Sequence, residues 1–133
     1  MCAQLRWMPK RILIVDDDVD LLMLLERSFE KKAYIVETAA SLPEAEEIIP
    51  EFDPQIVLLD INVNGEDGRQ LCWKLKQQHD KNVKVMIMSG YDYNPTRSSL
   101  FGADGLVPKP FYTDYLFKRI EEFLEQEVSK KQA

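Results

Sequence analysis

Residues 12–20 read ILIVDDDVD, four aliphatic residues followed directly by three aspartates. An unbroken apolar run of this length, rich in Ile and Val, is typical of a strand that is buried on both faces of a parallel sheet. Two like charges about 4 Å apart near a protein surface repel by roughly 4 kcal/mol, so the aspartates need a reason to stand together. Either they start a helix, or a positive group lies beside them.

Similar aliphatic runs recur along the chain and are separated by amphipathic patterns. Further strands are predicted at residues 34–38, 56–59, 83–88 and 106–107. Helices are predicted at residues 19–31, 42–51, 68–79, 95–101 and 113–130. Five strands that alternate with five helices indicate an α/β fold, a three-layer sandwich around a five-stranded parallel sheet.

Composition limits the classes of function. A chain of 133 residues with 45% hydrophobic and 30% charged residues is typical of one globular domain. Its net charge of −6 disfavours direct nucleic-acid binding. Two cysteines and one histidine support neither a disulfide framework nor a zinc site. The sequence has no apolar signal and no run that approaches the roughly 18 apolar residues of a membrane span. We therefore expect a cytoplasmic protein with no membrane insertion.

Polar residues follow the predicted strands at the edge where open parallel sheets bind ligands. These strand-end residues are Asp16, Asp17, Asp60, Ser89 and Lys109. Clustered carboxylates without histidine or cysteine suit a hard cation, and Mg²⁺ typically takes one or two carboxylates together with waters and phosphate oxygens. A bound Mg²⁺ would relieve the repulsion between the aspartates.

Each of these residues also has an ordinary explanation when it is considered alone. Asp18 is expected to cap the following helix. Ser89 precedes Gly90 in a common turn dipeptide, and Lys109, between two prolines, is compatible with a solvated lysine. The coincidence of all the strand ends at one edge is what favours a functional site.

The order and the spacing of four stretches carry a family resemblance. These stretches are ILIVDDD, IVLLDINVNGEDG, VMIMSG and GADGLVPKPF. The chain resembles the receiver domain of two-component response regulators, in particular the stand-alone, chemotaxis-regulator-like receivers. The resemblance implies a flavodoxin-like sheet with strand order 2-1-3-4-5 and five helices. We expect the receiver domain at residues 10–128, between tails at residues 1–9 and 129–133.

The resemblance also implies a Mg²⁺ site. Its ligands would be Asp17, Asp60 and the main-chain carbonyl of Asn62, and Asp16 would act largely through a metal-bound water.

The same resemblance makes Asp60 the phosphoacceptor. It would take a phosphoryl group from the phosphohistidine of a sensor histidine kinase or a phosphotransfer protein. Ser89 and Lys109 would contact the phosphoryl oxygens. Since phosphoryl transfer needs mostly positioning and charge cancellation, these residue types suit the reaction. Such a domain catalyses only its own phosphorylation and dephosphorylation, so it is not an enzyme in the ordinary sense.

Some positions depart from the family pattern. Asn64 replaces a proline and Glu66 an apolar residue, which predicts a loop that proline stiffens less. Leu106 stands where many receivers have Tyr or Phe, whose ring turns inward on activation. Tyr91, two residues after Ser89, is expected to hinder the attacking water and prolong the phosphorylated state.

Downstream, we expect a protein partner to bind the face formed by the fourth helix, fifth strand and fifth helix; a phosphorylation-dependent homodimer stays open. Three alternatives remain. In the first, the chain is a receiver excised from a larger regulator with a DNA-binding or enzymatic output domain. In the second, it is a Mg²⁺-dependent phosphohydrolase that forms an aspartyl phosphate. A flavodoxin-like cofactor binder is disfavoured because three aspartates after the first strand would repel a phosphate.

Overall fold

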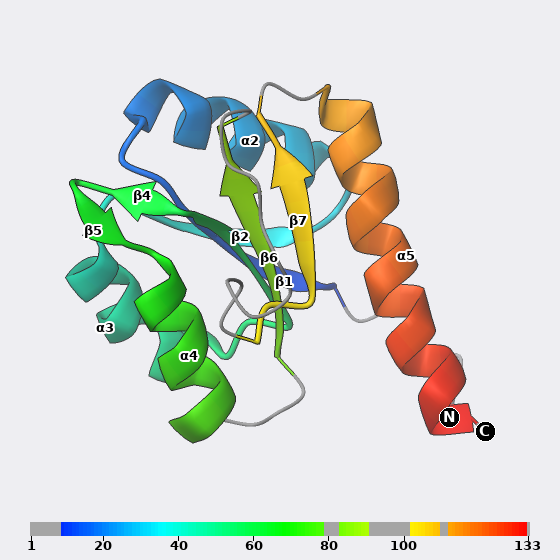
Figure 1. Cartoon of the computed structure of the whole chain (residues 1–133). Coiled ribbons are helices and arrows are strands. Elements are labelled where there is room, and N and C mark those ends of the chain that lie inside the picture. The colour runs from blue at the N-terminus through cyan, green and yellow to red at the C-terminus, as the bar shows by residue number, and fades with distance from the viewer. Residues whose placement is uncertain (1–8, 79–82, 91–101, 110–111, 133) are drawn as a thin grey trace.

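The computed structural model describes residues 9–78, 83–90, 102–109 and 112–132 (Figure 1). Its centre is a five-stranded sheet in the order β2-β1-β3-β6-β7, in which every neighbouring pair is parallel. The strands are β1 (Arg11–Val15), β2 (Ile35–Ala39), β3 (Ile56–Asp60), β6 (Lys84–Ser89) and β7 (Gly105–Pro108). The predicted sheet and its strand order are confirmed.

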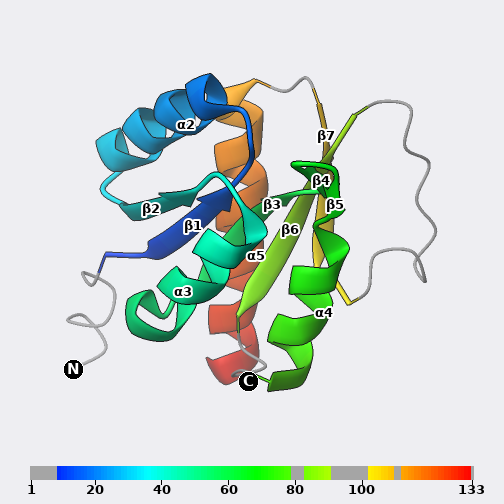
Figure 2. The same ribbon diagram turned by 90° about the vertical axis from the view of Figure 1, so that its left-hand side faces the viewer.

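Helices cover both faces of the sheet, as Figures 1 and 2 show from two sides. The described helices are α2 (Val19–Lys31), α3 (Leu42–Phe52), α4 (Arg69–Gln78) and α5 (Thr113–Gln132). Helices α2 and α5 pack on one face, and α3 and α4 on the other. The predicted helix at residues 95–101 lies outside the described residues. Helix α5 continues to Gln132, two residues beyond its predicted end.

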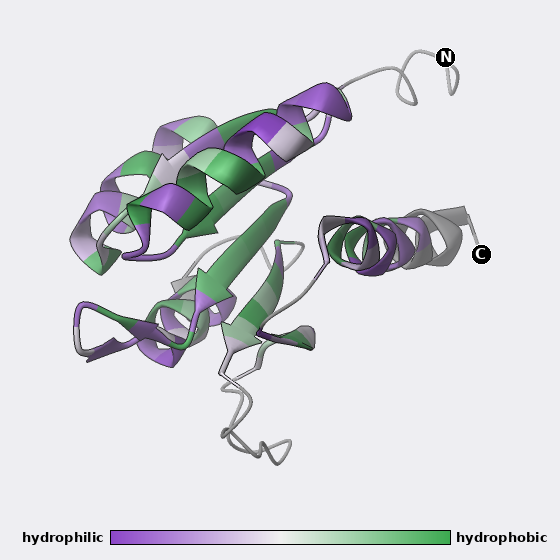
Figure 3. Ribbon diagram, turned by 90° about the horizontal axis from the view of Figure 1, so that it is seen from above, coloured by the Kyte–Doolittle hydropathy of each residue, from purple (hydrophilic) through white to green (hydrophobic). Residues whose placement is uncertain are grey.

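The central strands supply both cores because successive side chains of a strand point to opposite faces. Ile12 and Ile14 of β1 join the core under α2 and α5, whereas Leu13 and Val15 join the core under α3 and α4. All four side chains are fully buried. Figure 3 shows the corresponding concentration of hydrophobic residues along the strands. An unbroken apolar run is therefore required in β1, as predicted.

The core on the α3 and α4 side contains the thiol of Cys72, which is fully buried. Burial raises the pKa of Cys72 to about 11; the nearby Lys76 acts to lower it and Asp104 to raise it.

Among the described residues, no helix combines the length and the apolar character needed to cross a membrane.

A short hairpin follows β3 and was not predicted. Strands β4 (Asn62–Val63) and β5 (Glu66–Asp67) pair antiparallel. Between them, Asn64 and Gly65 have φ of 54° and 81°, and a type I′ turn requires positive φ at both of these positions. Asn-Gly is the residue pair that favours such a turn. The expected lower stiffness of this segment stays a prediction.

Tyr34 lies in the core between α2 and α5, where its ring packs edge-on against Phe29 with 5.1 Å between centroids. Its buried hydroxyl has no hydrogen-bond partner among the described residues. An unsatisfied buried polar group costs about 1–3 kcal/mol. We therefore expect Tyr34→Phe to raise the free energy of unfolding by about 1 kcal/mol at pH 7, as measured by urea unfolding.

The same substitution has a pH signature. Burial, with a smaller contribution from the charge of Glu121, raises the pKa of Tyr34 from 10.0 to about 12. The folded protein therefore keeps the phenolic proton more tightly than the unfolded chain does. The stability from this proton is fully present below pH 10 and is lost as the pH rises through 12. Tyr34→Phe should lack this alkaline loss, and an equal loss in both proteins would contradict the assignment.

Candidate functional site

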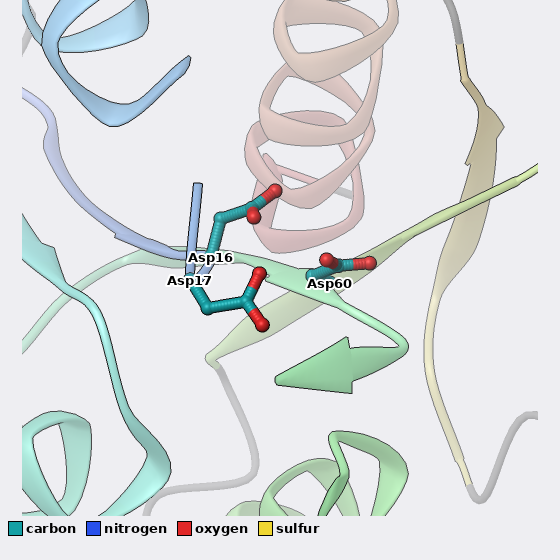
Figure 4. A group of neighbouring side chains, drawn as sticks. All are labelled: Asp16, Asp17 and Asp60. Atoms are coloured by element: carbon teal, nitrogen blue, oxygen red, sulfur yellow. The ribbon is translucent and has the colours of Figure 1, made fainter. Parts of the chain in front are cut away.

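Three carboxylates meet at the carboxyl edge of the sheet (Figure 4). Asp16 and Asp17 follow β1, and Asp60 is the last residue of β3. One oxygen from each residue lies within 4.8 Å of the others. Asp16 is fully buried, Asp60 is 8% exposed and Asp17 is exposed. The strand-end aspartates predicted to cluster are thus brought together.

Asp18, the remaining member of the aspartate run, has a different role. It is the N-cap of α2, and its side chain accepts a hydrogen bond from the main-chain N–H of Leu21 at 3.2 Å. The prediction that Asp18 caps the helix is confirmed. The run of three acids therefore combines one cap residue with two members of the cluster.

Lys109, directly after β7, places its ammonium between two of the carboxylates. Its Nζ donates to Asp16 Oδ2 at 2.7 Å and lies 3.3 Å from Asp60 Oδ2. The other oxygen of Asp16 accepts the main-chain N–H of Asp18 at 2.9 Å. Both oxygens of Asp16 are therefore engaged, whereas Asp60 has the longer of the two contacts with the ammonium.

The pKa values of this group follow from the same arrangement. Burial and the charge of Asp16 raise the pKa of Asp60, and Lys109 and a backbone hydrogen bond with Asn62 offset this only in part. Burial alone would lower the pKa of Lys109. The hydrogen bond to Asp16 and the two carboxylate charges outweigh burial, so the pKa of Lys109 is raised. The cluster is short of positive charge.

Ser89 ends β6 beside this cluster and is almost completely buried. Its main-chain carbonyl accepts the N–H of Lys109 at 2.6 Å, which fixes the backbone of the lysine next to the serine. Asn62 begins β4, two residues after Asp60. All the residues predicted for the site therefore lie on segments that meet at one edge of the sheet.

Two further residues of this edge were missed by the sequence interpretation. Asn64 donates its main-chain N–H to Asp17 Oδ2 at 2.8 Å. Gly68 packs so closely that a Cβ at this position would overlap the main-chain carbonyl oxygen of Asp60. The available signals were the Asn-Gly pair and the Asp-Gly pair shortly after it, both of which mark tight backbone turns.

The close approach of Gly68 predicts a stability effect. In Gly68→Ala the new methyl group meets rigid backbone, so we expect a loss of about 1–3 kcal/mol, as found for overpacked sites. Gly90→Ala is the matched control, since a Cβ there has no atom of the described residues within 4 Å. Urea unfolding of both variants checks the prediction. Equal stability of the two would show that the backbone beside Asp60 yields easily.

The donors at this edge are suited to a small hard cation. The three carboxylates of the cluster provide oxygen only, which is the ligand type that Mg²⁺ prefers. The three carboxylates face one ammonium, that of Lys109, and the pKa of Asp60 is raised first by burial and then by the charge of Asp16. The residues present therefore fit a divalent cation.

Comparison with known proteins shows the family to which this fold and these motifs belong. The family model of the response regulator receiver domain matches residues 12–121. The chain belongs to this family. As a receiver domain it is a signalling module of two-component systems, which agrees with the resemblance seen in its four motifs.

Solved structures of other receiver domains have the same architecture. A CheY-like receiver domain protein from Methanospirillum hungatei JF-1 is 30% identical with a TM-score of 0.83, and the match covers 92% of this chain and 99% of that one. A receiver domain from Bermanella marisrubri is 32% identical with a TM-score of 0.76, over 88% and 99% of the two chains. Flavodoxin-like topology is thereby confirmed.

One similar structure is a longer protein. NtrX from Brucella abortus is 32% identical with a TM-score of 0.85, and the match covers 94% of this receiver domain but 29% of the NtrX chain. The similarity therefore extends to receivers that stand alone and to receivers within larger proteins. The boundaries at residues 10 and 128 stay a prediction.

Proposed function

We propose that this receiver domain accepts a phosphoryl group on Asp60 from the phosphohistidine of a sensor histidine kinase or a phosphotransfer protein. A carboxylate oxygen of Asp60 attacks phosphorus, an acyl phosphate forms, and the bond between phosphorus and the histidine nitrogen breaks. The observation that carries this proposal is the convergence of Lys109 and three carboxylates at the end of β3.

Asp60 is the favoured nucleophile for a geometric reason. Asp16 is fully buried and both of its oxygens accept short hydrogen bonds. Asp60 is also buried but keeps 8% exposure, and its closest contact to the ammonium is 3.3 Å. This contrast also disfavours Asp16 as the nucleophile that the phosphohydrolase alternative would place at the end of the first strand.

The oxygen-only donor set supports Mg²⁺ as the cofactor. Asp17, Asp60 and the main-chain carbonyl of Asn62 would hold the ion, and Asp16 would act through a water molecule. When bound, Mg²⁺ would supply positive charge against the oxygens of the transferred phosphoryl group.

The protein's own residues would complete the charge balance. The ammonium of Lys109, which already lies between two carboxylates, would pair with one phosphoryl oxygen. The hydroxyl of Ser89 would donate a hydrogen bond to another. Because these groups are fixed at strand ends, they would need little rearrangement to stabilise the transferring group.

Phosphorylation would replace the single negative charge of the Asp60 carboxylate by a phosphoryl group of about −1.5 to −2 charge, and it would shift the domain between two conformations. We infer that a downstream protein recognises the face that includes β7 and α5. In this face, Leu106 is half-buried and Gly105 packs closely on the ring of Phe123. Tyr91 and residues 95–101 lie outside the described residues. We also propose a cytoplasmic location and a phosphorylation-dependent dimer. The match to NtrX allows a third proposal, an output domain in a longer chain.

Chemical mapping tests the function in the unmodified protein. We expect acetyl phosphate with Mg²⁺ to add one phosphoryl group, and borohydride reduction followed by peptide mass analysis to locate it on Asp60. A chelator in the same reaction is the control and should prevent labelling. Modification of another residue, or full labelling in the presence of chelator, would contradict the proposal.

A further inference from the structure

Asp17 is the exposed member of the carboxylate cluster. Among the described residues, the one hydrogen bond to its carboxylate comes from the main-chain N–H of Asn64, which lies 2.8 Å from Oδ2. An exposed carboxylate without a fixed donor samples several rotamers. The orientation of Asp17 toward the cluster therefore depends on how firmly Asn64 is held.

Asn64 is held by three features of its own segment. Its side-chain Nδ2 donates to the main-chain carbonyl of Ala40 at 2.9 Å, which ties the turn to the segment after β2. The neighbouring Val63 is fully buried and anchors the hairpin in the core. The N–H of Gly65 donates to Asn62 Oδ1 at 3.0 Å and closes the turn. The donor that reaches Asp17 is thus part of a hairpin that is tied to the core and to the segment after β2.

We propose that Asn64 is a positioning residue that orients Asp17 for Mg²⁺ binding. This inference rests on the proposed function of the cluster. One oxygen of Asp17 accepts the N–H of Asn64. Because this hydrogen bond fixes the whole carboxylate, it also fixes the direction of the other oxygen. A hydrogen bond to the carboxylate also withdraws negative charge and reduces the repulsion from its neighbours. Partners of this kind that orient metal ligands commonly tune affinity.

Asparagine meets three requirements at this position. It tolerates a φ of 54°, it has the main-chain N–H that Asp17 accepts, and it has the amide that bonds to Ala40. Glycine would keep the conformation and the N–H but lose the anchor to Ala40. Proline would lose the N–H as well, and its φ near −65° does not fit the turn.

These differences give a graded experiment. Mg²⁺ dissociation constants are measured calorimetrically for wild type, Asn64→Gly and Asn64→Pro, each with Asp17 intact and in an Asp17→Ala background. We expect about ten-fold weaker binding for Asn64→Gly, which keeps the fold of the turn, and a larger loss for Asn64→Pro. With Asp17 removed, the Asn64 substitutions should cause no further loss. Ala33→Gly, which relieves another positive φ of 68° in a turn that follows α2, is the matched control and should bind Mg²⁺ like wild type.

A second readout needs no metal. In amide NMR spectra of the metal-free protein, the Asn64 N–H should move upfield in Asp17→Ala, because the charged acceptor is gone. Wild-type affinity in both Asn64 variants, or equal losses with and without Asp17, would overturn the inference and leave the proposed function intact. No Mg²⁺ binding by wild type would overturn both.

Discussion

Asp60→Asn is expected to abolish phosphorylation by acetyl phosphate and to make the metal-free protein more stable at pH 7. The amide keeps the shape of the side chain but is not a nucleophile. The stability gain follows from the raised pKa of Asp60, which burial and the charge of Asp16 cause. The favourable contribution of the protonated group is present below its ordinary pKa of 3.8 and is lost as the pH rises through the higher folded value.

Two measurements check this pair of effects. Intact mass after incubation with acetyl phosphate and Mg²⁺ reports labelling, and urea unfolding with a chelator reports stability. Asp20→Asn is the matched control, since Asp20 is an exposed acid in the first turn of α2. It should keep full labelling and lose about 0.3–1 kcal/mol from the helix terminus. Labelling of Asp60→Asn would remove Asp60 as the acceptor.

Lys109→Met should have the opposite effect on stability. The substitution keeps an unbranched side chain but removes the ammonium that bonds Asp16 and contacts Asp60. Breaking a buried charge pair typically costs about 3–5 kcal/mol. The lysine side chain is 26% exposed, so we expect a loss near the lower end of that range, measured by urea unfolding without metal.

Mg²⁺ should recover part of this loss. Without the ammonium, the cation competes with no protein charge for the cluster, so the variant should bind Mg²⁺ more tightly and gain more stability from it than wild type does. Lys74→Met is the matched control. Its surface ion pair with Glu46 is well exposed, and its loss should change stability by about 0–1 kcal/mol without altering the response to Mg²⁺. Equal Mg²⁺ affinity in Lys109→Met and wild type would contradict the competition.

The sheet could be predicted from the sequence because each strand is marked by a short run of neighbouring apolar residues. Buried parallel strands need continuous apolar runs, because both of their faces are covered. Strands β1 and β3 are such strands, since their side chains enter the cores on both faces of the sheet. The strand ends followed from the same runs, since Asp16, Asp60 and Ser89 are the first polar residues after them. The parallel register then brings these ends to one edge.

Other features depend on geometry that no local pattern contains. The two-residue strands of the β4 and β5 hairpin are too short to show periodicity, and the Asn-Gly pair was interpreted as a loop that lacks proline. The preference of Lys109 for Asp16 over Asp60 depends on distances across 93 residues of sequence. The bond from Asn64 to Asp17 joins main chain to side chain, so residue types alone do not predict it.

The buried thiol of Cys72 provides a built-in measure of local opening. At neutral pH it is protonated, because its pKa is about 11, and it is shielded from reagents by full burial. An alkylating agent can therefore react at this position only in molecules whose α4 has transiently separated from the sheet. The alkylation rate of the Cys72 peptide would report how often that half of the protein opens, and whether phosphorylation of Asp60 changes that frequency.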